Sequence, residues 1–207
     1  MIEIELLELI KKIQDMKAET QTVEVKAAHH GCPKRLYDTL SAFSNQDSGG
    51  VLIFGLDETN DFQSVGVYDV QDLQKKVNEQ CKQMVPPIRP IFTSVRYGSG
   101  YIVSAEIPAT DVTERPCYYG GVGRTKGSYV RSGDSDEPMT DYEIYSYEAF
   151  RKKYQDDIRV NEKADMTTID MSALNRYIQL VKDKNPNLSK LPDQDVFRFL
   201  NIVIDGK

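Results

Sequence analysis

The sequence has no tryptophan and only three cysteines among its 207 residues, namely Cys32, Cys81 and Cys117. Because the number is odd and no pair is spaced as CxxC, neither a disulfide framework nor a zinc knuckle is predicted. No apolar run reaches the roughly 18 to 20 residues that a membrane-spanning helix needs. The start of the chain is acidic and amphipathic, whereas a signal peptide is basic and then apolar. We therefore expect a cytoplasmic protein with reduced thiols and no membrane partner.

An excess of positive charge is also missing. The 26 Lys and Arg residues stand against 32 Asp and Glu residues, which gives a formal net charge of −6. This charge excludes proteins that coat nucleic acid through overall positive charge, so any basic surface must be local. No GxxxxGK[ST] motif occurs, and no GxGxxG links a strand to a helix, so nucleotide hydrolysis is not predicted.

The centre of the predicted fold is the short apolar run from Val51 to Phe54. Four consecutive β-prone apolar residues are typical of a strand that is buried on both faces. Gly49 and Gly50 precede this strand and permit a tight reversal or a close approach to the main chain. Asp57 and Glu58 follow it, at the strand end where functional groups concentrate in mixed α/β sheets.

Apolar periodicity and turn residues predict the other elements. Helices are expected over residues 3–17, with Ile4, Leu7, Ile10, Ile13 and Met16 as the apolar stripe, and over 33–45, 69–84 and 140–154. Strands are expected over 22–27, with a polar side open to a groove or solvent, over 62–67 as a hairpin partner of the central strand, and over 91–96 and 101–107 as a second hairpin. Two further short strands are expected within 118–130.

A polar stretch over residues 155–168 predicts a linker, with two amphipathic helices at 172–182 and 193–204 after it. Their apolar stripes contain Tyr177 and Phe199, and two short helices make only a small core. The predicted fold class is α+β, a mixed β-sheet with flanking helices and a short C-terminal helical segment. The predicted domains are residues 1–157 and 158–207.

Carboxylates gather near the ends of two predicted strands, at Glu19, Glu24, Asp57 and Glu58. If strand 22–27 lies beside the central strand, Glu19, Glu24 and Asp57 could hold Mg²⁺ or Mn²⁺ for phosphodiester hydrolysis. Lys26 would then offset charge on the phosphate. The alternative is a set of exposed carboxylates on a strand and a turn, without a shared role.

The segment 115–131 combines four basic side chains and three tyrosines with no acidic residue. This composition favours a glycine-rich hairpin that contacts phosphates and stacks on bases. The phosphate contacts are predicted for Arg115, Arg124, Lys126 and Arg131, and the stacking for Tyr119 and Tyr129. The alternative is a solvated hairpin whose tyrosines pack on the sheet. His29, His30 and Cys32 would supply only one side of a metal site.

Three sequence elements occur in the order of a known family. They are an E-x4-E-x-K element from Glu19 to Lys26, an AFxN…GG…GxxD/E element over residues 42–58, and a YxRxG element over 129–133. Together they resemble the Schlafen-type AlbA-like domain over about residues 15 to 155. Val25 departs from the aromatic residue usual in the family, the loop before Gly49 is longer, and either Asp57 or Glu58 can take the acidic position.

The resemblance implies a mixed α+β domain that binds nucleic acid, DNA above all, in bacterial transcriptional regulators and helicase-like divergent ATPases. An ATPase-like segment and a winged-helix region follow in those proteins, so we expect this chain to be an N-terminal part of one. In animal Schlafen proteins the acidic trio belongs to an RNA endonuclease, which here implies Glu19, Glu24 and either Asp57 or Glu58.

Three functions therefore compete. The basic segment favours a nucleic-acid-binding domain without a required cofactor, as part of a cytoplasmic regulator. The carboxylates favour a metal-dependent endoribonuclease that uses Mg²⁺ or Mn²⁺. The negative net charge favours a structural module that forms a homodimer or docks a C-terminal region.

Overall fold

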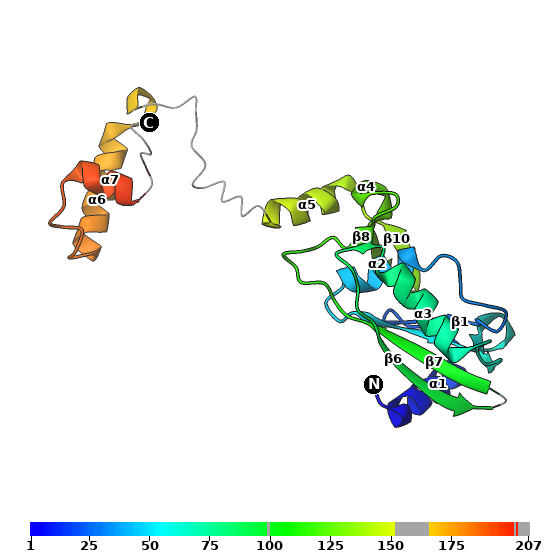
Figure 1. Cartoon of the computed structure of the whole chain (residues 1–207). Coiled ribbons are helices and arrows are strands. Elements are labelled where there is room, and N and C mark those ends of the chain that lie inside the picture. Colours follow the sequence, from blue (N-terminus) through cyan, green and yellow to red (C-terminus); the bar gives the residue numbers. More distant parts are fainter. Residues whose placement is uncertain (99, 152–165, 201, 203–207) are drawn as a thin grey trace. The chain divides into compact units, whose positions relative to one another are not determined.

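The computed structural model describes residues 1–98, 100–151, 166–200 and 202 (Figure 1). The chain divides into two compact units, an N-terminal unit from Met1 to Lys152 and a C-terminal unit from Lys153 to Lys207. Most of the linker predicted over residues 155–168 lies outside the described residues, as does the end of the helix predicted to reach residue 154. None of the helices in the described ranges is both long and apolar enough to cross a membrane.

A mixed four-stranded sheet forms the centre of the N-terminal unit. Its order is β1 (Val23–Lys26), β2 (Gly50–Phe54), β7 (Gly100–Ile107) and β6 (Ile91–Tyr97). β1 runs parallel to β2, whereas β7 is antiparallel to both β2 and β6. The predicted α+β class, the buried strand β2 and the hairpin β6–β7 are confirmed.

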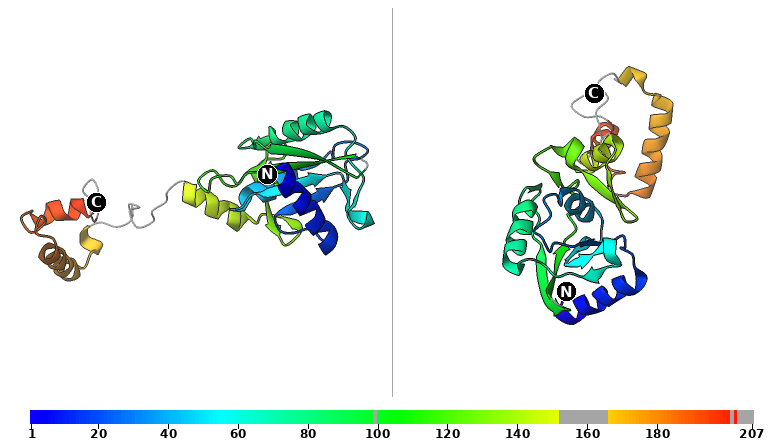
Figure 2. Two further views of the ribbon diagram at one scale, coloured as in Figure 1. Left: turned by 90° about the horizontal axis from the view of Figure 1, so that it is seen from below. Right: turned by 90° about the vertical axis from the view of Figure 1, so that its right-hand side faces the viewer.

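One face of the sheet is covered by α1 (Glu3–Met16), which Figure 2 shows in dark blue. Leu6, Ile10 and Ile13 are its buried residues and pack against apolar side chains of β1, β2, β6 and β7. The predicted stripe was partly wrong, because Ile4 is 64% and Met16 is 50% exposed. The buried positions follow i, i+4 and i+7 spacing, which keeps them on one side of a helix with 3.6 residues per turn.

The opposite face is covered by α2 (Tyr37–Asn45) and α3 (Val70–Cys81). Leu40, Phe43, Leu73 and Val77 pack there with apolar residues of β2 and β7. A Cβ atom on Gly50 would lie 2.3 Å from Cγ of Phe43, so this position requires glycine because α2 approaches the strand closely.

The prediction of a helix starting at Pro33 was wrong, because α2 begins only at Tyr37. The backbone just before α2 forms hydrogen bonds with a side chain of α3 instead. Leu36 N–H donates to Oε1 of Gln80 at 3.0 Å, and the carbonyl of Pro33 accepts from Nε2 of Gln80 at 2.8 Å. These bonds hold the segment against α3, and they use the Leu36 N–H and the Pro33 carbonyl, which are therefore not available for a helical turn.

Three two-stranded pairs flank the main sheet. β3 (Leu56–Asp57) pairs with β4 (Gln63–Ser64), β5 (Met84–Val85) with β8 (Tyr118–Tyr119), and β9 (Tyr129–Ser132) with β10 (Ser135–Pro138). Two expectations are therefore wrong. The strand predicted at 62–67 does not pair with β2, because β1 and β7 occupy both edges of β2. Likewise, segment 115–131 is not a hairpin, since α4 (Arg124–Gly127) separates β8 from β9 and each strand pairs elsewhere.

The last helix of the N-terminal unit is α5 (Asp141–Arg151), and the short 3-10 helix η1 (Glu58–Asn60) follows β3. The C-terminal unit contains η3 (Met166–Thr168), α6 (Met171–Lys184) and α7 (Asp193–Phe199). Among the described residues of this unit, a small core is formed by the buried side chains of Leu174, Ile178, Val196 and Phe197. The predicted stripes were partly wrong, because Tyr177 is 50% and Phe199 is 66% exposed. Part of the segment predicted to reach residue 204 lies outside the described residues.

Candidate functional site

Glu24 lies on β1, on the side of the sheet that faces α2 and β9. The residue is buried, so the expectation that the polar side of this strand faces a groove or solvent was wrong for it. Its Oε1 binds Nζ of Lys26, and its Oε2 accepts from Nη2 of Arg131 at 2.8 Å. Both carboxylate oxygens of Glu24 are therefore engaged by cations of the same chain.

Arg131 is the centre of this buried network. In the register of the β9–β10 pair it lies opposite Asp136, and its Nη1 donates to Oδ1 of Asp136 at 2.8 Å. Thr39 on α2 donates from its hydroxyl to Oδ2 of the same aspartate at 2.6 Å. The Arg131 side chain is 1% exposed, and its guanidinium carbon lies 5.2 Å from the ring centre of Phe43. The expected contact with a phosphate does not fit this position, because the guanidinium is an internal counter-ion.

Glu19 precedes β1 and adds a second carboxylate to the network. Its Oε1 accepts from Val25 N–H at 2.7 Å, and its Oε2 lies 3.8 Å from Nη2 of Arg131. Burial raises the pKa of Glu19 to about 7, and the negative charges of Glu24 and Glu58 act in the same direction. Burial would also raise the pKa of Glu24, but the bonds from Lys26 and Arg131 outweigh it and lower that pKa. At neutral pH, Glu24 therefore carries the charge while Glu19 is partly protonated.

The raised pKa of Glu19 predicts a pH-dependent effect of Glu19→Gln. Between about pH 4.5 and 7 the folded wild type binds more protons than the unfolded chain, so its stability falls as pH rises through this window. Glutamine keeps the acceptor for Val25 N–H but has no charge to bury. The variant should match the wild type at about pH 4, below the unfolded pKa, and exceed it by on the order of 2 kcal/mol at pH 8, in urea denaturation. Glu8→Gln, an exposed control on α1, should follow the wild type, and parallel curves for Glu19→Gln would contradict the burial argument.

Asp57 and Glu58 occupy different positions at the end of β3. Oδ1 of Asp57 accepts from Thr59 N–H at 3.0 Å and from the Thr59 hydroxyl at 2.7 Å, so this carboxylate caps η1. Glu58 is exposed, and its charge acts on Glu19. Of the two residues that can take the family's acidic position, Glu58 is thus the one whose charge contributes to the raised pKa of Glu19.

A divalent cation does not fit this arrangement. Hard cations need carboxylate oxygens that are free to approach to about 2.0 to 2.6 Å. The oxygens of Glu24 are taken by Lys26 and Arg131, and one oxygen each of Glu19 and Asp57 accepts local hydrogen bonds. Within the part of the chain that the structure describes, no group of three or more His, Cys, Asp or Glu side chains is arranged to hold a metal ion.

The basic residues of segment 115–131 do not form one surface, because they differ in burial and in ion pairing. Arg115 is buried, donates from Nε to the Thr110 carbonyl at 2.9 Å and pairs with Asp47 at 2.7 Å. Arg124 binds Glu148 and lies 5.5 Å from the ring centre of Tyr118. Lys126 is exposed. Only Lys126 among the four predicted phosphate contacts thus combines exposure with a position on the cavity described next.

A cavity of about 370 Å³ lies where the start of α2 meets β8, α4 and β9. Its lining includes three cations and three tyrosines, together with Asp38, Val122 and Gly127. The cations and tyrosines are Lys34, Arg35, Lys126, Tyr37, Tyr119 and Tyr129. The rings of Tyr37 and Tyr119 are stacked, with 3.7 Å between centroids and an angle of 12° between planes. Arg35 pairs with Asp38 at 2.9 Å, and its Nη2 lies 3.5 Å from the Tyr129 hydroxyl. The site therefore joins positive charge to aromatic surface.

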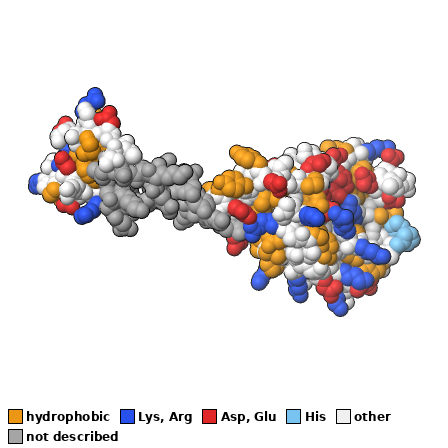
Figure 3. All heavy atoms as spheres, turned by 90° about the horizontal axis from the view of Figure 1, so that it is seen from above, with side chains coloured by type: hydrophobic (Ala, Val, Ile, Leu, Met, Phe, Trp, Pro, Cys, Tyr) orange, Lys and Arg blue, Asp and Glu red, His pale blue; other side chains and the backbone are white. Residues whose placement is uncertain are grey.

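Two of the predicted stacking residues, Tyr119 and Tyr129, thus meet Lys126 in one cavity. Lys34, Arg35 and Tyr37 were not predicted as site residues, and they belong to the segment that was predicted as helix. Their adjacent positive charges just before an aromatic residue were the available signal. On the face shown in Figure 3, Lys and Arg side chains are interspersed with Asp and Glu over the N-terminal unit.

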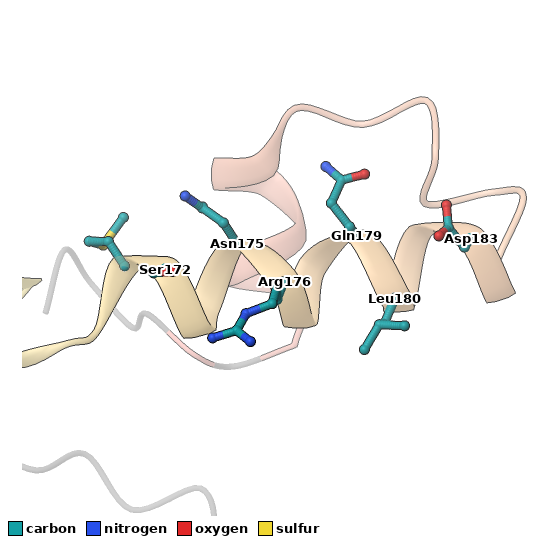
Figure 4. Close-up of a pocket in the computed structure, with 7 residues that line it drawn as sticks. Ser172, Asn175, Arg176, Gln179, Leu180 and Asp183 are labelled. Carbon is teal, nitrogen blue, oxygen red and sulfur yellow. The ribbon is translucent and has the colours of Figure 1, made fainter.

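A larger cavity of about 740 Å³ lies along α6 in the C-terminal unit (Figure 4). Its lining residues recur at three- and four-residue spacing along this single helix. They are chemically mixed, with amides at Asn175 and Gln179 and opposite charges at Arg176 and Asp183. This composition offers neither the cluster of cations nor the aromatic surface of the cavity beside α2.

Comparison with known proteins identifies relatives of the N-terminal unit. The family model described as Schlafen, AlbA_2 matches residues 19–140. The solution structure of the N-terminal domain of an ATP-dependent DNA helicase RecG-related protein from Nitrosomonas europaea is similar, with 25% identity and a TM-score of 0.50. That match covers 64% of this chain and 92% of the other.

The crystal structure of the DIP2311 protein from Corynebacterium diphtheriae has 17% identity and a TM-score of 0.47. The match covers 94% of this chain but only 36% of the DIP2311 chain, so this chain spans about a third of that protein. Among curated proteins, no significant match was found.

Proposed function

Since this chain belongs to the Schlafen, AlbA_2 family, we propose that its N-terminal unit is a nucleic-acid-binding domain whose contact surface is the cavity beside α2. The observation that carries the proposal is the meeting of Lys34, Arg35 and Lys126 with three tyrosines around one cavity. Cations contact phosphates, which positions a nucleic acid, while aromatic rings stack on its bases.

The distribution of charge supports this location. A net charge of −6 repels a polyanion from most of the surface, so binding depends on a local group of cations. Arg35 is partly neutralised by Asp38, which leaves Lys34 and Lys126 as the main phosphate contacts at the rim. Arg115 and Arg131 are buried and serve the fold.

We further propose that the domain binds DNA as the N-terminal part of a larger regulator. Support comes from the family and from the likeness to an N-terminal domain of a protein described as DNA helicase RecG-related. Dimerisation stays a prediction. The metal-dependent nuclease is not proposed, because Lys26 and Arg131 already engage the carboxylate that it requires.

Alanine substitutions at Lys34 and Lys126 test the proposal. Each lost phosphate contact should flatten the slope of log Kd against log salt by about 0.7 to 0.9, and the double variant should bind roughly tenfold more weakly at low salt. Fluorescence anisotropy with a labelled oligonucleotide measures both quantities. Lys12→Ala, which removes an exposed lysine from α1 on the other face of the sheet, is the matched control. An unchanged slope for the double variant would place the contact surface elsewhere.

A further inference from the structure

The shape of the site indicates whether single-stranded or double-stranded nucleic acid is the preferred ligand. We propose that the cavity beside α2 receives an unpaired nucleotide, so that the preferred ligand is single-stranded nucleic acid. This inference rests on the nucleic-acid-binding function proposed above.

The site is concave and of the size of a small-molecule pocket. Its volume of about 370 Å³ falls in the range of roughly 300 to 1,000 Å³ typical of ligand sites. Bases in a duplex are stacked and paired inside a convex rod and cannot enter such a cavity. Unpaired bases can turn outward and stack on aromatic side chains. The cavity therefore fits a single nucleotide and excludes a paired one.

The aromatic surface of the cavity is held in place before any ligand arrives. The ring of Tyr119 stacks on Tyr37 and packs closely against Gly121, where a Cβ atom would lie 2.4 Å from Cζ of Tyr119. A Cβ atom on Gly127 would lie 2.7 Å from the Tyr119 carbonyl oxygen. The loop thus closes around this tyrosine because it has glycine at both positions. A ring fixed in this way loses little freedom on binding, which favours affinity.

The exposed helices of the N-terminal unit do not suit a duplex. A helix that reads the major groove carries basic or amide side chains toward the bases and phosphates. Within residues 1–98 and 100–151, α1 starts with exposed Glu3 and Glu5, and α5 starts with Asp141. On α3, Lys76 is paired with Asp72 at 2.7 Å. α4 has only four residues, which is too short for this role.

A comparison of the affinities of the full chain for two probes tests the inference. Fluorescence anisotropy would compare a labelled 12-nucleotide oligo-dT strand with a 12-base-pair dA·dT duplex at the same salt concentration. We expect the single strand to bind at least about tenfold more tightly. Tyr37→Ala should remove most of this preference and leave duplex binding within about twofold. Tyr37→Phe keeps the ring and should retain the preference, and thermal melting shows that each variant is folded.

The outcomes separate this inference from the proposed function. Equal affinity for the two probes, or tighter binding of the duplex, would overturn the single-strand preference and leave nucleic-acid binding intact. A preference that survives in folded Tyr37→Ala would overturn the assignment to this cavity. Failure to bind either probe at low salt would overturn both the inference and the function on which it rests.

Discussion

Replacing Arg131 with methionine is expected to lower the free energy of unfolding by about 3 to 5 kcal/mol. Methionine fills a similar volume but leaves the buried carboxylate of Glu24 and the partly buried carboxylate of Asp136 without their shared cation. Removing one partner of a buried ion pair has a large effect, because the remaining charge keeps its desolvation penalty. Arg131 pairs with Glu24 and Asp136 at 2.8 Å and with Glu19 at 3.8 Å, and its side chain is 1% exposed.

Paired variants distinguish the electrostatic cause from lost packing. Adding Glu24→Gln to Arg131→Met should restore part of the stability, because it removes a buried charge that would keep only Lys26 as its partner. Arg96→Met, an exposed arginine on β6, should change the free energy of unfolding by less than about 0.5 kcal/mol. Urea denaturation measures all three. A loss below about 1 kcal/mol for Arg131→Met would show that the network does not hold β9 and β10 in place.

Replacing Asn45 with leucine is expected to destabilise the protein by about 3 kcal/mol, since several buried backbone groups lose their partner at once. Nδ2 of Asn45 donates to the carbonyls of Cys117 at 2.9 Å and Tyr129 at 3.0 Å. Its Oδ1 accepts from Cys117 N–H at 2.7 Å. This one side chain therefore ties the end of α2 to the segments that carry the tyrosines of the cavity.

The variants of Asn45 can be ranked by the groups that they leave unpaired. Asn45→Asp keeps an acceptor for Cys117 N–H, but its buried carboxylate would face the carbonyls of Cys117 and Tyr129 without a donor. At pH 7 its loss of stability should therefore be at least as large as that of Asn45→Leu. Asn60→Leu, at an exposed position in η1, is the control and should be nearly neutral. Thermal melting followed by circular dichroism gives the order. Equal melting temperatures for Asn45→Leu and the wild type would contradict the role assigned to these bonds.

Local patterns were enough to predict the centre of the fold. The four apolar residues of β2 and the glycine-containing loop of the β6–β7 hairpin encode these elements within a few neighbouring residues. The start of α2 could not be predicted in the same way, because the side chain of Gln80 on α3 forms hydrogen bonds with the backbone of Pro33 and Leu36. The pairing partners of β8 and β9 were not predicted for a similar reason, since the sequence of a strand does not specify which strand it pairs with.

The candidate site was predicted only in part. Lys126, Tyr119 and Tyr129 were predicted to belong to a binding surface, and all three line the cavity. The sequence does not distinguish these residues from Arg131, because burial and ion pairing arise from tertiary packing. Lys34, Arg35 and Tyr37 are far from segment 115–131 in sequence, and only the fold brings them to the same cavity.

Mapping of amide chemical shifts by NMR during titration with a short oligo-dT strand tests the central claim most directly. We predict that the largest changes fall on residues 34–38, 118–119 and 126–129, around the cavity beside α2, with little change at Glu19 or along α1. Changes centred on Glu19, Lys26 and Glu58 would contradict this account, because they would place the nucleic acid at the carboxylates and not at the basic and aromatic cavity.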